Sequence, residues 1–193
     1  MFYYFIINPS SSSGKHKTLW REIKEQLDKE EINYKIAATK KTGDAKRLAR
    51  EASLQVSEQN PCTIVAIGGD GTVNEVVNGL ILSPFLSFGY IPTGSGNDLA
   101  RGLGLSKEPL EALDFILHPK EKKAVRIGQV VTKNSEEEEG EKRRFVISSG
   151  AGFDAAVCHH SIQSKTKNML NFLRIGKLTY LFTALKLLMK YPY

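Results

Sequence analysis

Four short apolar runs in residues 1–118 place the strongest constraint on how this chain can fold. Segments with apolar residues at helical spacing lie between them, and the runs are YYFII (3–7), YKIAA (34–38), TIVAI (63–67) and SFGYI (87–91). Strands that are apolar on both faces and separated by helices form a parallel sheet with helices on both sides. The order βαβαβαβ therefore predicts an α/β domain with a doubly wound parallel sheet, whose ligands bind beyond the carboxyl ends of the strands.

The helices between and after these runs are expected at about 18–29, 44–58, 72–82 and 110–117. After His118-Pro119 the pattern changes to two strand-like segments, 124–132 and 144–153, joined by a charged tip. Leu178, Leu181, Phe182, Leu185, Leu188 and Met189 then recur at helical spacing. We therefore expect domains at 1–123 and 124–193, the second incomplete and mainly β with a helix.

Composition excludes several classes of protein. With 41% hydrophobic and 25% charged residues, the chain is neither disordered nor fibrous. The first apolar run lacks a basic leader, and the longest uncharged apolar stretch near the C-terminus, 178–185, is shorter than the roughly 20 residues that a spanning helix needs. A cytoplasmic protein is expected. The two cysteines and four histidines have no spacing typical of a redox or zinc site.

The net charge of +6 is unevenly distributed, because all of the basic excess lies in residues 140–193. From Ala155 to Tyr193 there are six basic residues and no acidic one, interleaved with aromatic residues. Such a segment favours an anionic surface such as phospholipid, nucleotide or nucleic acid. Packing of its leucine stripe onto the second domain is the structural alternative.

The third apolar run ends in Gly68-Gly69-Asp70-Gly71, and a helix is expected directly after it. The first amides of a helix lack intrahelical acceptors and lie at its positive end, so they attract phosphate. Glycines there allow close approach of a ligand and positive φ. The loop is neither a dinucleotide-binding fingerprint nor a GxxxxGK[ST] loop. A carboxylate at Asp70 is explained by a magnesium ion or by the proton of a substrate hydroxyl.

Two further loops have a similar composition. PTGSGNDLARGLGL (92–105) offers the hydroxyl of Ser95 between glycines, and Asn97 or Asp98 can cap the next helix. Asp98 is either such a cap or part of a catalytic or metal network. The first run ends in NPSSSSGKHK, a polar and partly cationic segment.

Together, NPxSxSGK (8–15), GGDGTVNEVVNGL (68–80), IPTGSGNDLARGLGL (91–105) and GAGFDAAV (150–157) resemble the diacylglycerol kinase catalytic domain family. The resemblance extends from residue 2 to about 190 and is strongest to its bacterial soluble lipid kinases. Sphingosine and ceramide kinases are related to this family, and NAD kinase more distantly.

The resemblance implies an enzyme that transfers the γ-phosphate of ATP to a hydroxyl of a diacylglycerol-like lipid, with Mg²⁺. It places Asp70 in the catalytic and magnesium network and Asp98 as a further candidate. The implied nucleotide contacts are Asn8, Ser13, Gly14, Lys15, Thr39, Gly68, Gly69, Gly71, Thr72, Asn74, Glu75, Gly94 and Ser95. At position 95 the family more often has threonine, and serine retains the hydroxyl.

In one respect the sequence departs from the family pattern. The family's second domain continues for roughly another hundred residues with the general base and magnesium carboxylates, so no metal ligand is identified in this sequence. An NAD kinase-type phosphotransferase and a nucleotide-binding module without activity are the alternatives. The expected partners are a lipid substrate and anionic phospholipid at the inner face of the membrane, where the protein would be peripheral. Nucleic acid is not expected, and a homodimer is left open.

Overall fold

The computed structural model describes residues 1–11, 16–133, 140–163 and 184–188. Contacts divide the chain into two compact units, Met1–Ile147 and Ser148–Tyr193. The candidate site residues that the structure describes all lie in the first unit, which contains both sheets.

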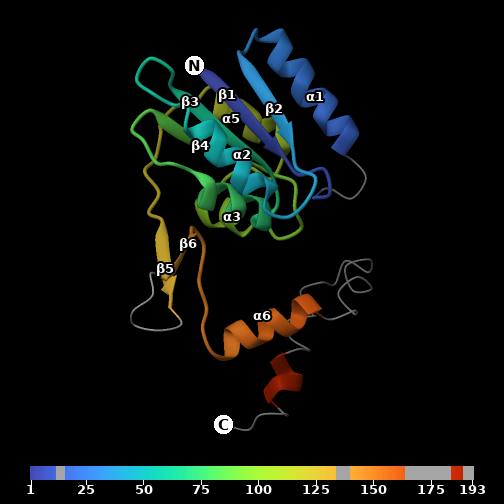
Figure 1. Cartoon of the computed structure of the whole chain (residues 1–193). Coiled ribbons are helices and arrows are strands. Elements are labelled where there is room, and N and C mark those ends of the chain that lie inside the picture. Colours follow the sequence, from blue (N-terminus) through green and yellow to red (C-terminus); the bar gives the residue numbers. More distant parts are fainter. Residues whose placement is uncertain (12–15, 134–139, 164–183, 189–193) are drawn as a thin grey trace. The chain divides into compact units, whose positions relative to one another are not determined.

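The larger sheet consists of four parallel strands in the order β2-β1-β3-β4 (Figure 1). The strands are β1 (Phe2–Ile7), β2 (Tyr34–Ala38), β3 (Cys62–Gly68) and β4 (Leu86–Pro92). Every residue of β3 is buried, whereas the edge strand β2 is half exposed. The mostly apolar sequence of β3, in which Thr63 is the polar exception, is explained by its central position with cover on both faces.

Helices cover both faces of this sheet. Alternate residues of β1 enter separate cores: Tyr4 and Ile6 pack with α2 (Asp44–Ser53), α3 (Asp70–Gly79) and α4 (Asp98–Leu103). Tyr3 and Phe5 pack with α1 (His16–Lys29) and α5 (Pro109–Leu117). The predicted α/β class and doubly wound sheet are confirmed.

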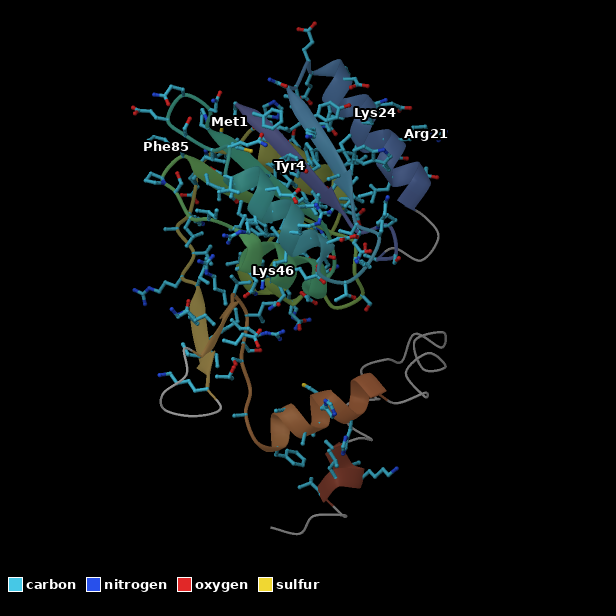
Figure 2. All side chains as sticks on the ribbon, in the orientation of Figure 1. Met1, Tyr4, Arg21, Lys24, Lys46 and Phe85 are labelled. Atoms are coloured by element: carbon cyan, nitrogen blue, oxygen red, sulfur yellow. The ribbon has the colours of Figure 1, made fainter. Side chains whose placement is uncertain are left out.

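Two helix boundaries differ from expectation. α2 ends at Ser53, not near residue 58, because the chain tightens into i→i+3 turns there, with Val56 N–H donating to Ser53 O. α3 begins two residues early, at Asp70, and ends at Gly79. A Cβ at Gly79 would collide with the carbonyl oxygen of Lys46, a residue of α2 that Figure 2 labels. Glycine at position 79 therefore allows α2 and α3 to pack closely.

The second sheet is an antiparallel hairpin of β5 (Gly128–Thr132) and β6 (Glu141–Phe145). The register pairs Thr132 with Glu141 and Gly128 with Phe145. The predicted hairpin is present, but a second strand over 144–153 is wrong. Pairing begins in the basic segment Glu141–Arg144 and stops at Phe145, because its partner strand starts at Gly128.

The base of the hairpin packs against the core beneath α2, α3 and α4. Ile127 and Val146, which flank the paired residues, contact the core formed with α2, α3 and α4. Asn78 of α3 also exchanges two hydrogen bonds with the backbone of Arg144 in β6. The hairpin therefore belongs to the compact unit Met1–Ile147, and the division into domains at residue 123 stays a prediction.

In the second unit, the structure describes α6 (Phe153–Gln163) and a helical segment, 184–188. Leu187 is buried there, while Leu185 and Leu188 are about half exposed. The rest of the expected apolar stripe, Leu178, Leu181, Phe182 and Met189, lies outside the described residues. Among the helices that are described, none combines the length and hydropathy needed to span a membrane.

Candidate phosphate-binding site

The carboxyl ends of all four parallel strands lie along one edge of the sheet. Backbone pairing continues one residue beyond the strands: Thr39 N–H donates to Ile7 O at 2.8 Å, Asn8 N–H to Ile67 O at 3.0 Å, and Thr93 N–H to Gly68 O at 2.9 Å. The loops that follow β1, β2, β3 and β4 are thereby aligned. This is the edge at which open parallel sheets bind their ligands.

Gly69 and Gly94 bring the loops after β3 and β4 into direct backbone contact. A Cβ on Gly94 would lie 2.6 Å from Cα of Gly69, and a Cβ on Gly69 would lie 3.3 Å from Cα of Gly94. Gly69 has ordinary extended backbone angles, φ −99° and ψ −171°. The positive φ that glycine allows is not used at Gly68, Gly69 or Gly71. Close approach of the two loops is therefore the reason for glycine at positions 69 and 94.

The start of α3 offers amides to an anion. The first amides of a helix have no acceptor within the helix. At α3 the residue before the helix is Gly69, which has no side chain that could accept from them. The side chain of Thr72 occupies the space where a Cβ at Gly68 would lie. At Gly71, by contrast, a Cβ would meet nothing within 4 Å. The open space beside Gly71, at the positive end of α3, suits a phosphate group.

Asp70 links the two glycine loops. Its Oδ1 accepts a hydrogen bond from the backbone N–H of Asp98 at 2.7 Å, and a Cβ on Gly96 would lie 2.8 Å from its Oδ2. The Asp98 carboxylate instead forms an ion pair with Arg101, Oδ1 to Nη2 at 2.7 Å. Neither Asn97 nor Asp98 caps α4 with its side chain in the expected way. Instead, the carboxylate of Asp70 accepts the hydrogen bond from the first amide of that helix, the N–H of Asp98.

Asn97 holds the loop after β4 in shape. Its backbone is left-handed, with φ 51°, and its side chain bonds both backbone groups of Gly94: Oδ1 accepts from the N–H at 3.0 Å, and Nδ2 donates to the O at 2.8 Å. The hydroxyl of Tyr90 lies 3.1 Å from Oδ1 of Asn97 and 3.3 Å from the carbonyl oxygen of Gly68. Burial raises the pKa of Tyr90, and the carboxylates of Asp70 and Asp98 raise it further, so the hydroxyl remains a donor.

The loop after β1 is tied to both glycine loops. Nδ2 of Asn8 donates to Oγ1 of Thr72 at 3.2 Å, and Oγ of Ser11 lies 2.8 Å from Oγ1 of Thr93. Asn8, Ser11 and Thr93 also line a small crevice at the end of β1, together with Trp20 of α1. The other expected contacts in this loop, Ser13, Gly14 and Lys15, lie outside the described residues.

The loop after β2 is fixed by two carboxylates. Oδ2 of Asp44 accepts hydrogen bonds from the backbone N–H groups of Lys40 and Lys41, at 2.8 and 3.1 Å. The bond from Lys40 is the main reason that the pKa of Asp44 is lowered. Oε2 of Glu75, an expected nucleotide contact, accepts from the N–H of Ala45 at 3.2 Å and so satisfies an amide at the start of α2. This loop carries Thr39.

Comparisons with known proteins identify a family. Residues 3–130 match the family model of the diacylglycerol kinase catalytic domain. The chain belongs to this family. Among curated relatives, a diacylglycerol kinase of Bacillus subtilis (strain 168) is 31% identical over 185 residues, which are 95% of this chain and 54% of the relative. One of Staphylococcus carnosus (strain TM300) is 32% identical over 184 residues, with 95% and 53% covered.

Solved structures of diacylglycerol kinases have the same fold. The crystal structure of a diacylglycerol kinase from Bacillus anthracis str. Sterne superimposes with a TM-score of 0.52 at 29% identity, covering 66% of this chain and 41% of that chain. This member of the diacylglycerol kinase catalytic domain family spans about half the length of the curated relatives that it matches.

Sequence reasoning missed several residues that build the site. Tyr90, and the bonds that Asn97 makes to Gly94, hold the second glycine loop, and Asp44 holds the loop that carries Thr39. An asparagine followed by Asp-Leu at the start of a helix indicates a helix cap. The sequence therefore predicts a cap at Asn97 and not its hydrogen bonds to Gly94 within the loop. In the described part of the chain, no three His, Cys, Asp or Glu side chains are grouped so that they could hold a metal ion.

Proposed function

We propose that this chain belongs to an enzyme that transfers the γ-phosphate of ATP to a hydroxyl of a diacylglycerol-like lipid. Membership in the diacylglycerol kinase catalytic domain family supports a lipid kinase. The observation that carries the proposal is the paired glycine loops, which leave open space at Gly71 while Asp70 lies between them.

The phosphates of ATP bind at the start of α3. The first-turn amides and the positive end of the helix favour the anion. The loops after β1 and β4 flank it through Asn8, Gly94 and Ser95, and Thr72 of α3 accepts a hydrogen bond from Asn8. Three further residues on this edge would contact the nucleotide: Thr39, Asn74 and Glu75. In the loop after β1, Ser13 would add a hydroxyl contact, Gly14 an amide and Lys15 a cation. Lys15 would neutralise phosphate charge.

Mg²⁺ fits this site only together with the nucleotide. The described residues supply no group of three or more ligating side chains, and Oδ1 of Asp70 is already hydrogen-bonded. Magnesium in kinases is commonly held by one or two carboxylates and by phosphate oxygens. Asp70 would supply one carboxylate oxygen, with Asp98 nearby as a further candidate, and the bound ion would neutralise phosphate charge.

In the reaction, the oxygen of the lipid hydroxyl forms a bond to the γ-phosphorus while the bond to the β,γ-bridging oxygen breaks. ADP leaves with that oxygen, and the hydroxyl proton passes to a base. Asp70 either orients the hydroxyl and accepts its proton or fixes the magnesium ion. Positioning and charge neutralisation supply most of the catalysis in this reaction class.

The lipid acceptor places the enzyme at a membrane surface, where the basic, aromatic segment 155–193 would contact anionic phospholipid. We therefore propose a peripheral protein at the inner face of the membrane. The homodimer remains an open alternative, to be tested by sedimentation.

The test is incubation with labelled ATP and magnesium, together with either diacylglycerol micelles or NAD. Labelled phospholipid is expected. NADP without labelled lipid would establish an NAD kinase activity instead, and bound ATP with neither product would establish a nucleotide-binding module without activity.

A second experiment tests the position of the phosphates. Gly71→Val introduces a side chain where a Cβ would meet nothing within 4 Å outside the backbone of α3 itself, so the fold should tolerate it. The side chain would nevertheless occupy the space assigned to phosphate. ATP affinity should fall strongly while the melting temperature changes little. Unchanged affinity would place the phosphates elsewhere.

A further inference from the structure

Asn78 and Arg144 join the β5–β6 hairpin to α3 from positions 66 residues apart in the sequence. Nδ2 of Asn78 donates to the carbonyl oxygen of Arg144 at 2.9 Å, and Oδ1 accepts from its backbone N–H at 2.8 Å. The side-chain amide of Asn78 thus bonds both the N–H and the C=O of Arg144, as the backbone of a neighbouring antiparallel strand would do.

The guanidinium of Arg144 adds a second contact with the same helix. Its Nη1 donates to the carbonyl oxygen of Leu80 at 2.6 Å and lies 3.4 Å from that of Val77. The last carbonyls of a helix lack intrahelical donors and carry partial negative charge, so a cation is favoured there. These bonds are partly buried, which reduces competition from water.

α3 connects this contact to the candidate site. The helix begins at Asp70 beside the glycine loops and ends at Gly79, next to the carbonyl that Arg144 binds. Apolar packing of Ile127 and Val146 also holds the hairpin, but such packing is not directional. The hydrogen bonds of Asn78 and Arg144 are directional contacts between β6 and α3, of the kind that can fix a register.

We propose that Asn78 and Arg144 are positioning residues for phosphotransfer. They hold the hairpin, the first element of the segment that we assign to the lipid side, in one register on the helix that carries Asp70. The proposal rests on the proposed function and adds to it a pair of residues that touches neither nucleotide nor lipid. Displacement of a reacting group by about 1 Å can lower a rate about a hundredfold, so loss of register should appear in turnover.

The experiment compares Asn78→Ala, Arg144→Ala and Arg144→Lys with a matched control, Arg143→Ala. Arg143 is the neighbouring basic residue of β6, but its side chain is exposed and pairs with Glu141. Three quantities are measured on the full chain: hydrogen exchange of the Arg144 amide, ATP affinity, and the rate of phosphate transfer to diacylglycerol in micelles.

Asn78→Ala should accelerate exchange of the Arg144 amide about tenfold, the usual effect of losing a hydrogen bond of this kind. Asn78→Ala and Arg144→Ala should lower kcat for lipid about tenfold or more while ATP affinity stays within about twofold. Arg144→Lys should restore part of the rate, because it keeps the cation but not the planar fork. Arg143→Ala should match the wild type in all three measurements.

Wild-type kcat in Asn78→Ala and Arg144→Ala would overturn the positioning role and leave the proposed function intact. A parallel loss of ATP affinity would also overturn it, because the residues would then stabilise α3 in general. A wild-type protein that binds ATP but transfers no phosphate to lipid would overturn the proposed function itself, and with it this role.

Discussion

Asp70 and Asp98, the first residues of α3 and α4, are joined by a hydrogen bond of 2.7 Å from the backbone N–H of Asp98 to Oδ1 of Asp70. One carboxylate therefore lies at the positive ends of two helices, where a negative charge is favoured. The same contact fixes the loop after β4 against the loop after β3. Asp70 thus has a structural role in addition to the catalytic or metal role proposed for it.

The two roles of Asp70 can be separated by two substitutions. Asp70→Asn retains an oxygen that can accept from Asp98 and removes the charge, so the fold should persist while phosphotransfer falls about 100-fold or more. ATP affinity should change much less. Asp70→Ala removes the acceptor as well and should lower stability further, by about 1–3 kcal/mol. Thermal unfolding and turnover are measured in parallel, and normal turnover in Asp70→Asn would leave Asp70 with only the structural role.

The contact between Gly69 and Gly94 gives a second prediction. Gly94→Ala would place a Cβ 2.6 Å from a backbone atom of Gly69, so the two loops must separate. We expect a loss of about 1–3 kcal/mol in stability and weaker ATP binding. Gly102→Ala in α4 is the control, since a Cβ there meets nothing within 4 Å and alanine favours the helix. Equal melting temperatures for the two variants would contradict the close contact.

How much of this site can be predicted from sequence depends on the range of the interactions. The succession of strands and helices along the chain, and the glycine loops at one sheet edge, follow from local patterns: apolar runs, helical spacing and turn residues. The bonds from Glu75 to Ala45 and from Asn78 to Arg144 do not, because each joins a side chain to the backbone of a distant segment. The expected strand over 144–153 differs from β6 for a related reason, because the sequence Glu141–Arg144 is charged and lacks the apolar pattern of a strand.

Tyr90 gives a prediction about pH. Its pKa is raised in the folded protein from the ordinary value of 10.0, so the folded state retains the hydroxyl proton more tightly than the unfolded state. The stability that this hydroxyl contributes is complete below pH 10 and decreases as the pH rises above it. Tyr90→Phe should therefore be about 1 kcal/mol less stable than the wild type near pH 7, and the difference should shrink above pH 10.

Urea unfolding at several pH values measures this difference. Tyr3, Tyr4 and Tyr34 also have raised pKa values. Because these three tyrosines are present in both the wild type and Tyr90→Phe, the difference in unfolding free energy between the two proteins isolates the contribution of Tyr90. A difference that stays constant up to pH 12 would show that the Tyr90 hydroxyl does not titrate differently on folding.

The basic segment 155–193 provides the last prediction, which concerns membrane binding. Each Lys or Arg near an anionic surface contributes about 1 kcal/mol of attraction, and this fades within a Debye length of about 10 Å at 0.1 M salt. Only some of these residues can face lipid at once, so Arg174, Lys177, Lys186 and Lys190 should contribute unequally. Of these four, the structure describes Lys186, which is exposed.

Cosedimentation with phosphatidylglycerol vesicles should exceed that with neutral phosphatidylcholine vesicles and should weaken at high salt. Replacing Lys186 and Lys190 together by glutamine should reduce binding to the anionic vesicles. The same change at Lys24 and Lys29, which are exposed on α1, serves as the control with equal loss of charge and should leave binding nearly unchanged. Equal binding to both lipids, or insensitivity to salt, would indicate that the segment packs within the protein and that the lipid enters elsewhere.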